Sequence, residues 1–270
     1  YAPLLEDIVD CCADQGVPAQ AITAEYAPGQ FEINLGHVPD PMRAADHCVM
    51  FQHAVRQVAR RHGMQATFMA KPYARETGSG MHLHMSLVDR DGNNVFDGGD
   101  ATLVGPRLKH ALGGLLETLP EAMAFIAPNH NSYRRFQPKS FVPLQRSWGI
   151  ENRSVAMRIP LGPAASRRIE HRVAGADANP YLALATALAG IHHGLTQRSD
   201  PGEAFTGNAG ERYDPAVPWR PRRGLETLAG GKTLRAYFGD DYIDTYIACK
   251  TAEMDKFESE ITEAEYRWFL

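Results

Sequence analysis

The sequence has 270 residues, of which 44% are hydrophobic and 22% charged, with a formal net charge of -4. These values are ordinary for a globular protein, and because lysine and arginine form no long runs they argue against a nucleic-acid scaffold. No apolar run approaches the ~20 residues that cross a bilayer, and no signal-peptide pattern opens the chain. We therefore expect a soluble, cytoplasmic protein.

Three further features narrow the class. Arginines cluster at 134–135, 153–158 and 167–172, which predicts a pocket for small anions. The first residue is Tyr1 rather than methionine, so the chain looks like a piece of a longer protein. The four cysteines show no metal-site spacing, and we expect reduced thiols rather than a disulfide framework at Cys11, Cys12, Cys48 and Cys249.

The first third of the chain predicts a helix, two extended segments and a second helix. Apolar residues at helical spacing cover residues 4–12, and a turn at Pro28-Gly29 separates two extended segments that carry Glu25 and Glu32. Residues 39–63 predict a long amphipathic helix, and residues 65–73 (QATFMAKPY) a short strand.

The remaining two thirds mix short strands with helices. In GSGMHLHMSL, residues alternate so that His82, His84 and Ser86 share one strand face. Residues 89–96 predict a turn, residues 102–127 two helices meeting at Pro120, and 129–152 an extended functional loop. Beyond these we expect strands at 154–160 and 167–173, a buried helix at 179–195, a surface loop at 199–224 and a helical part at 225–270.

The polar faces of these strands carry carboxylates, imidazoles and guanidinium groups. Carboxylates with an imidazole suit Mg²⁺ or Mn²⁺, and nearby arginines suit phosphate or carboxylate substrates. Together these groups are typical of a phosphoryl-transfer site. Each feature also has a plainer interpretation, since strand histidines are often hydrogen-bonded partners and the GSG turn lacks the lysine of a P-loop. Their co-occurrence favours a site without naming a reaction.

Four motifs in order resemble the catalytic domain of the glutamine synthetase family, the ATP-dependent glutamate-amine ligases. They are FMAKPYARETGSGMHLHMSL, NSYRRFQP, ENRSVAMRIP and RRIEHRVAGADANPYLALAT. The resemblance implies an α+β catalytic domain over residues 1–270, with a curved, mainly antiparallel half-barrel sheet backed by helices. It also implies a γ-glutamyl phosphate, formed from ATP and glutamate and then attacked by an amine.

The resemblance further assigns roles to residues. Glu25, Glu32, His82 and Glu170 resemble ligands of two divalent cations, Mg²⁺ or Mn²⁺. His84, Ser86, Arg158 and Arg168 resemble ATP contacts. Arg135, Arg153 and Arg172 resemble the residues that handle glutamate and the transferred phosphoryl group, and Gly78 matches a backbone contact to glutamate.

The sequence departs from the family near the amine. A flap glutamate that helps deprotonate ammonium aligns with Phe141, whose apolar ring suits an alkylamine. The first arginine of the family's R-N-R-S motif is Glu151, which we hypothesise attracts the cationic amine, and an asparagine before G-S-G is Thr77. This pattern favours an organic amine or polyamine as acceptor, as in γ-glutamylpolyamine synthetases. A glutamine synthetase using ammonia is the alternative.

The family also has an N-terminal β-grasp domain and a strand with an E-x-E-like pair, and neither precedes Tyr1 in this sequence. Family members form homo-oligomers of stacked rings with sites between subunits, so we expect the 270 residues alone to be inactive. Two other readings remain: a catalytically silent structural member, and a phosphagen-kinase-like enzyme, against which the order of the motifs argues.

Overall fold

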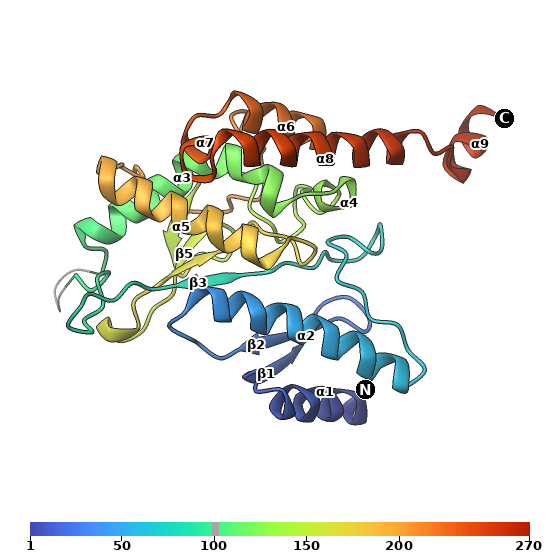
Figure 1. Cartoon of the computed structure of the whole chain (residues 1–270), viewed down its shortest axis with the longest axis horizontal. Coiled ribbons are helices and arrows are strands. Elements are labelled where there is room, and N and C mark those ends of the chain that lie inside the picture. The colour runs from blue at the N-terminus through green and yellow to red at the C-terminus, as the bar shows by residue number, and fades with distance from the viewer. Residues whose placement is uncertain (99–102) are drawn as a thin grey trace.

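The computed structural model describes residues 1–98 and 103–270. Its N-terminal part is a β-hairpin packed with two helices (Figure 1). The Asp40 carboxylate caps the second helix by accepting from the N–H groups of Met42 and Arg43. Strand pairing places Glu32 opposite Thr23. The elements are α1 (Ala2–Asp14), β1 (Ala19–Ala24), β2 (Phe31–Leu35) and α2 (Pro41–Arg61).

The centre of the molecule is a four-stranded sheet in the order β3-β6-β5-β4. β6 pairs antiparallel with both β3 and β5, whereas β4 and β5 are parallel. The register places His84 beside Glu170, and Glu170 beside Arg158, so three predicted site residues form a row across the sheet. The strands are β3 (Leu83–Met85), β4 (Trp148–Ile150), β5 (Met157–Ile159) and β6 (Ile169–His171).

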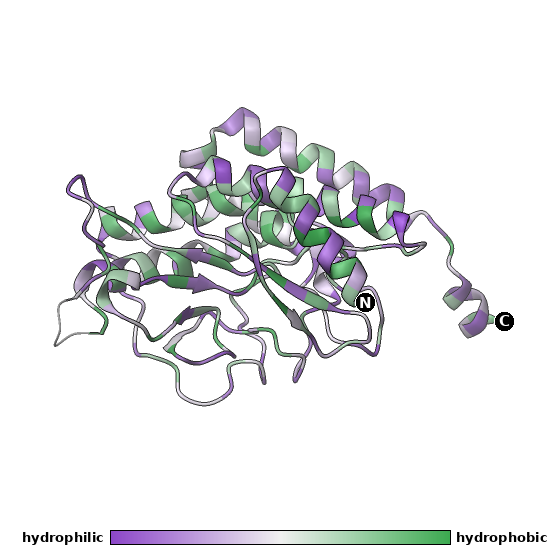
Figure 2. Ribbon diagram, turned by 90° about the horizontal axis from the view of Figure 1, so that it is seen from below, coloured by the Kyte–Doolittle hydropathy of each residue, from purple (hydrophilic) through white to green (hydrophobic). Residues whose placement is uncertain are grey.

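Helices that follow residue 105 cover this sheet and form the main core with it (Figure 1). α3 and α5 cross closely at Gly114 and Gly194. The other helices of this part of the chain pack outside them or follow at the C-terminus. The longer helices carry both apolar and polar residues along their length (Figure 2), as expected for helices with one buried side. They are α3 (Pro106–Ile126), α4 (His130–Tyr133), the 3₁₀ turn η1 (Ala164–Ser166), α5 (Pro180–Gln197), α6 (Pro221–Gly230), α7 (Thr233–Phe238), α8 (Asp240–Glu258) and α9 (Glu263–Phe269).

Three predicted elements differ from the structure. The expected loop at 129–152 contains the short helix α4 and the strand β4. Residues 65–73 form no strand, because no described backbone hydrogen bond joins residues 65–69 to a neighbouring strand. Instead of two helices meeting at Pro120, one helix, α3, runs through it, and the buried Leu119 and Ala122 on either side hold the helix together despite the lost N–H donor. Residue 102, where that prediction began, lies outside the described residues.

Other expectations hold at this level. The chain has an α+β fold, and all four cysteines are free thiols. Within the described residues, no helix is long and apolar enough to span a membrane.

Candidate active site

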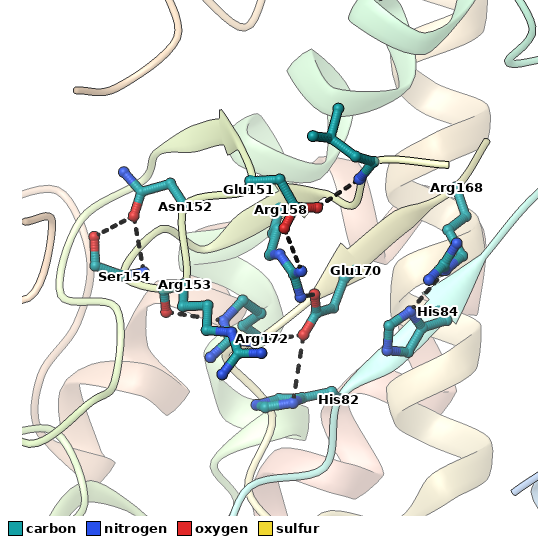
Figure 3. Close-up of polar contacts among 11 residues, drawn as sticks. His82, His84, Glu151, Asn152, Arg153, Ser154, Arg158, Arg168, Glu170 and Arg172 are labelled. Atoms are coloured by element: carbon teal, nitrogen blue, oxygen red, sulfur yellow. Dashed lines mark hydrogen bonds and ion pairs between the residues drawn. The ribbon is translucent and has the colours of Figure 1, made fainter. Parts of the chain in front are cut away.

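Glu170 is the centre of a polar cluster on the sheet (Figure 3). Its carboxylate is 2% exposed. Arg158 Nη1 donates to Oε2 at 2.6 Å, Arg172 Nη1 donates to Oε1, and His82 Nδ1 lies 3.5 Å from Oε1. A single buried carboxylate thus faces two guanidinium groups and one imidazole, which come from β5, from the residue directly before β3 and from the residue directly after β6.

The charges of this cluster set its protonation. Burial alone would raise the pKa of Glu170, but the positive charges of Arg172 and Arg158 oppose it, and the pKa lies below its usual range. Burial, helped by the positive charge of Arg172, lowers the pKa of His82 to about 3. His82 is therefore neutral at physiological pH and keeps a lone pair that can bind a metal ion.

A second carboxylate, Glu151, reaches Arg158 from the other side. Arg158 Nη2 donates to Glu151 Oε2 at 2.9 Å, and the Leu161 N–H donates to Oε1. These bonds lower the pKa of Glu151, the Leu161 N–H contributing most. Glu151 lies in the left-handed backbone region with φ 52°. The contacts show Glu151 orienting Arg158, and its predicted attraction of the amine remains a prediction.

The predicted nucleotide residues lie at the edge of the cluster. Arg168 Nε donates to His84 Nδ1 at 3.1 Å, which fixes the imidazole beside β6. Ser86 follows directly after β3, on the same side as His84 by alternation. With Arg158 in the row across the sheet, these side chains form one continuous polar surface.

The predicted glutamate-handling residues surround the glycine turn at 78–80. The buried Arg135 donates from Nη1 to Val173 O at 2.7 Å and lies beneath the turn, where a Cβ on Gly80 would come within 2.8 Å of Nη2. A Cβ on Gly78 would likewise lie 2.7 Å from Ala70 O, so the turn requires glycine there. Arg172 Nε donates to the carbonyl of Arg153 at 3.1 Å, which joins the last two predicted residues to the cluster.

The hairpin β1–β2 brings two more carboxylates toward Glu170. Burial and the charges of Glu25 and Glu170 raise the pKa of Glu32, while Arg172 and Arg153 lower it less. A carboxylate whose pKa is raised by neighbouring negative groups is stabilised in its ionised form by a bound cation. Three carboxylates and a neutral imidazole suit Mg²⁺ or Mn²⁺ in kind. Among the described residues, however, no three His, Cys, Asp or Glu side chains gather closely enough to hold a metal ion unaided.

Sequence reasoning missed two residues at this end of the site. Gln30 joins the hairpin turn to the glycine turn, since its Nε2 donates to Gly78 O at 3.1 Å and its Oε1 accepts from Thr77 Oγ1 at 2.8 Å. Tyr26 stacks on Phe141 with ring centroids 5.0 Å apart. The position of Tyr26 directly after the predicted metal ligand Glu25 could have indicated that Tyr26 lies near the site.

Comparison with known proteins places this arrangement in a family. The model of the glutamine synthetase catalytic domain matches residues 1–269. The chain belongs to the glutamine synthetase family. It is 44% identical over 270 residues to the gamma-glutamylputrescine synthetase PuuA of Escherichia coli (strain K12), covering 100% of this chain and 57% of that protein.

Two further comparisons show similar coverage. The gamma-glutamylethanolamide synthetase GlnA4 of Streptomyces coelicolor (strain ATCC BAA-471 / A3(2) / M145) is 36% identical over 266 residues, which are 98% of this chain and 56% of that protein. The solved structure of apo GmaS without ligand aligns with a TM-score of 0.87 at 31% identity, over 98% of this chain and 62% of that one. This glutamine synthetase-family chain thus spans somewhat more than half the length of these relatives.

Proposed function

We propose that this protein uses ATP to join the γ-carboxylate of glutamate to an organic amine through a γ-glutamyl phosphate. The observation that carries the proposal is the buried Glu170 carboxylate between Arg158, Arg172 and neutral His82, in a chain of the glutamine synthetase family. Such a cluster suits the binding of a metal–nucleotide complex and the neutralisation of transferred charge.

In the proposed site each group has one task. Glu25 and Glu32 would hold one divalent cation and His82 and Glu170 another; bound Mg²⁺ or Mn²⁺ supplies charge neutralisation at the phosphates. Further ligands would complete both shells. His84, Ser86, Arg158 and Arg168 contact ATP. Arg135, Arg153, Arg172 and the backbone of Gly78 bind glutamate and the phosphoryl group, and Glu151 positions Arg158.

The proposal favours an organic amine over ammonia. Phe141 stands where the family has a proton-accepting flap glutamate, and its ring offers apolar contact to carbon chains. Two of the relatives are named for putrescine and ethanolamide products. The proposal also includes a half-barrel sheet backed by helices, and a homo-oligomer of stacked rings with the active sites between subunits.

A panel of acceptors tests the proposal. The natural full-length protein is given glutamate, ATP and Mg²⁺ or Mn²⁺ with ammonia, putrescine, spermine, ethanolamine or simple monoamines, and ADP release is measured. We expect an organic amine to give the highest kcat/KM. Ammonia as the best acceptor would make the protein a glutamine synthetase, and no turnover with any acceptor would favour a silent structural member.

A further inference from the structure

Two aromatic side chains from distant segments meet at the edge of the site. The rings of Tyr26 and Phe141 stack with centroids 5.0 Å apart and planes inclined by 22°. Both residues are largely exposed, Tyr26 by 76% and Phe141 by 66%. Each ring therefore covers one face of its neighbour and leaves the remaining apolar surface open to a ligand.

The loop that carries Phe141 is held in an unusual conformation. Phe141 has φ 60° and Lys139 φ 64°, a left-handed backbone that bulky residues rarely adopt. Lys139 N–H donates to Gly210 O at 3.2 Å, and Ser140 Oγ donates to Arg135 O at 3.1 Å. Strained backbone that its surroundings hold in place is concentrated at functional sites. The loop thus fixes Phe141 against Tyr26.

The turn that carries Tyr26 is fixed as well. Glu25 N–H donates to Gln30 O at 2.9 Å, and Gln30 Nε2 donates to both Gly78 O and Ser79 Oγ, at 3.1 and 3.2 Å. The turn that carries Tyr26 is therefore hydrogen-bonded to the glycine turn at which the proposed function places glutamate.

Both rings follow directly on segments that belong to the proposed site. Tyr26 directly follows Glu25, the hairpin carboxylate nearest the turn, and Phe141 follows Ser140, which bonds to the backbone of Arg135. Arg135 in turn lies beneath Gly80. The two rings are thus carried by segments that hold one proposed metal-binding residue and one proposed glutamate-binding residue.

We infer that Tyr26 and Phe141 form an aromatic wall that binds the carbon chain of the acceptor, which makes the acceptor an aliphatic primary amine rather than ammonia. This inference rests on the proposed function. Methylene groups gain by leaving water for the ring faces, and a second ammonium at the far end of a diamine is attracted to the same faces. Ammonia has no carbon chain and gains nothing from the wall.

The test is a chain-length series. In the natural full-length protein, kcat and KM are measured separately for ammonia, methylamine, propylamine, butylamine and putrescine. We expect KM to fall about three- to fourfold for each added methylene up to four carbons. Tyr26→Ala, Phe141→Ala and the double variant should flatten this dependence while the KM values for ATP and glutamate stay the same, and Tyr26→Phe should retain it.

Tyr242→Ala is the matched control, because Tyr242 on α8 is also an exposed ring, stacked on Phe238 at 5.6 Å. It should keep the wild-type dependence. If the wild type ligates alkylamines without any dependence on chain length, or if the double variant retains it, the aromatic wall is overturned and the proposed function stands. If the wild type uses ammonia alone, both are overturned.

Discussion

At Glu170, a buried carboxylate is stable because other groups share its charge. Removing an ionised carboxylate from water costs several kcal/mol, and only well-oriented partners offset that cost. Arg158 and Arg172 both donate to it, and His82 remains neutral beside it. Loss of Glu170 would therefore leave the two guanidinium groups without their shared carboxylate, just as loss of either arginine would leave Glu170 with less compensation for its burial.

Replacing Glu170 by glutamine should destabilise the protein strongly. Glu170→Gln leaves two neighbouring guanidinium groups without their shared carboxylate, and we expect the free energy of unfolding to fall by about 3 kcal/mol. Urea unfolding measures the loss. Glu151→Gln is the control: its carboxylate also binds Arg158 but is 41% exposed, so the loss should be under about 1 kcal/mol. Equal losses would contradict the central role of Glu170.

Among the helices, α3 and α5 pack at contact distance through glycine. A Cβ on Gly114 would lie 2.1 Å from Gly190 O and 2.4 Å from Gly194 N, and backbone atoms cannot move aside. Gly114→Ala should therefore lower the free energy of unfolding by about 3 kcal/mol or more, as measured by urea unfolding. The control is Gly230→Ala at the end of α6, where a Cβ meets nothing within 4 Å. A mild effect of Gly114→Ala would show that the helices are not in contact there.

The segment between α5 and α6 holds the Phe141 loop through Asp214. Asp214 N–H donates to Leu144 O at 2.8 Å, and Arg146 Nε donates to Asp214 Oδ2 at 2.8 Å. Burial alone would raise the pKa of Asp214. The hydrogen bonds from Arg146 and the Ala216 N–H outweigh burial, so the folded-state pKa of Asp214 is below its usual value.

A depressed carboxyl pKa gives stability that is present above the unfolded pKa, about 3.9, and is lost as the pH falls through the folded value. Asp214→Asn should thus cost about 1 kcal/mol at pH 7. In urea unfolding, the gap between wild type and variant should stay constant down to about pH 5 and shrink below about pH 4. A gap that does not change with pH would show that the charge of Asp214 contributes nothing.

The sequence could predict what depends on local periodicity. Alternation placed His82 and His84 on one face, and the helical spacing located α1, α2 and α5. The segment 65–73 has strand-like periodicity too, but a strand also needs a neighbouring backbone, which no local pattern reports. Pro120 indicated a break, whereas packing on both sides of α3 prevented it. The contact between Tyr26 and Phe141 joins distant segments, so only the fold reveals it.

At the scale of the whole molecule, the chain covers 57% of the length of PuuA. Its four proposed metal ligands supply two side chains to each of two cations, and among the described residues no three candidate ligands gather tightly. We expect residues 1–270 alone to release ADP at a small fraction of the rate of the natural full-length protein under the same conditions. Equal rates would show that these residues contain the complete site.

The path of one oxygen atom tests the central claim most directly. In the proposed reaction a γ-carboxylate oxygen of glutamate attacks the terminal phosphorus of ATP and ADP leaves. The amine then attacks the acyl carbon, and phosphate leaves with that oxygen. With glutamate labelled with ¹⁸O in the γ-carboxylate and the best amine of the panel, mass spectrometry should find one ¹⁸O atom in the released phosphate and a γ-glutamyl amide. Phosphate without ¹⁸O would contradict the account.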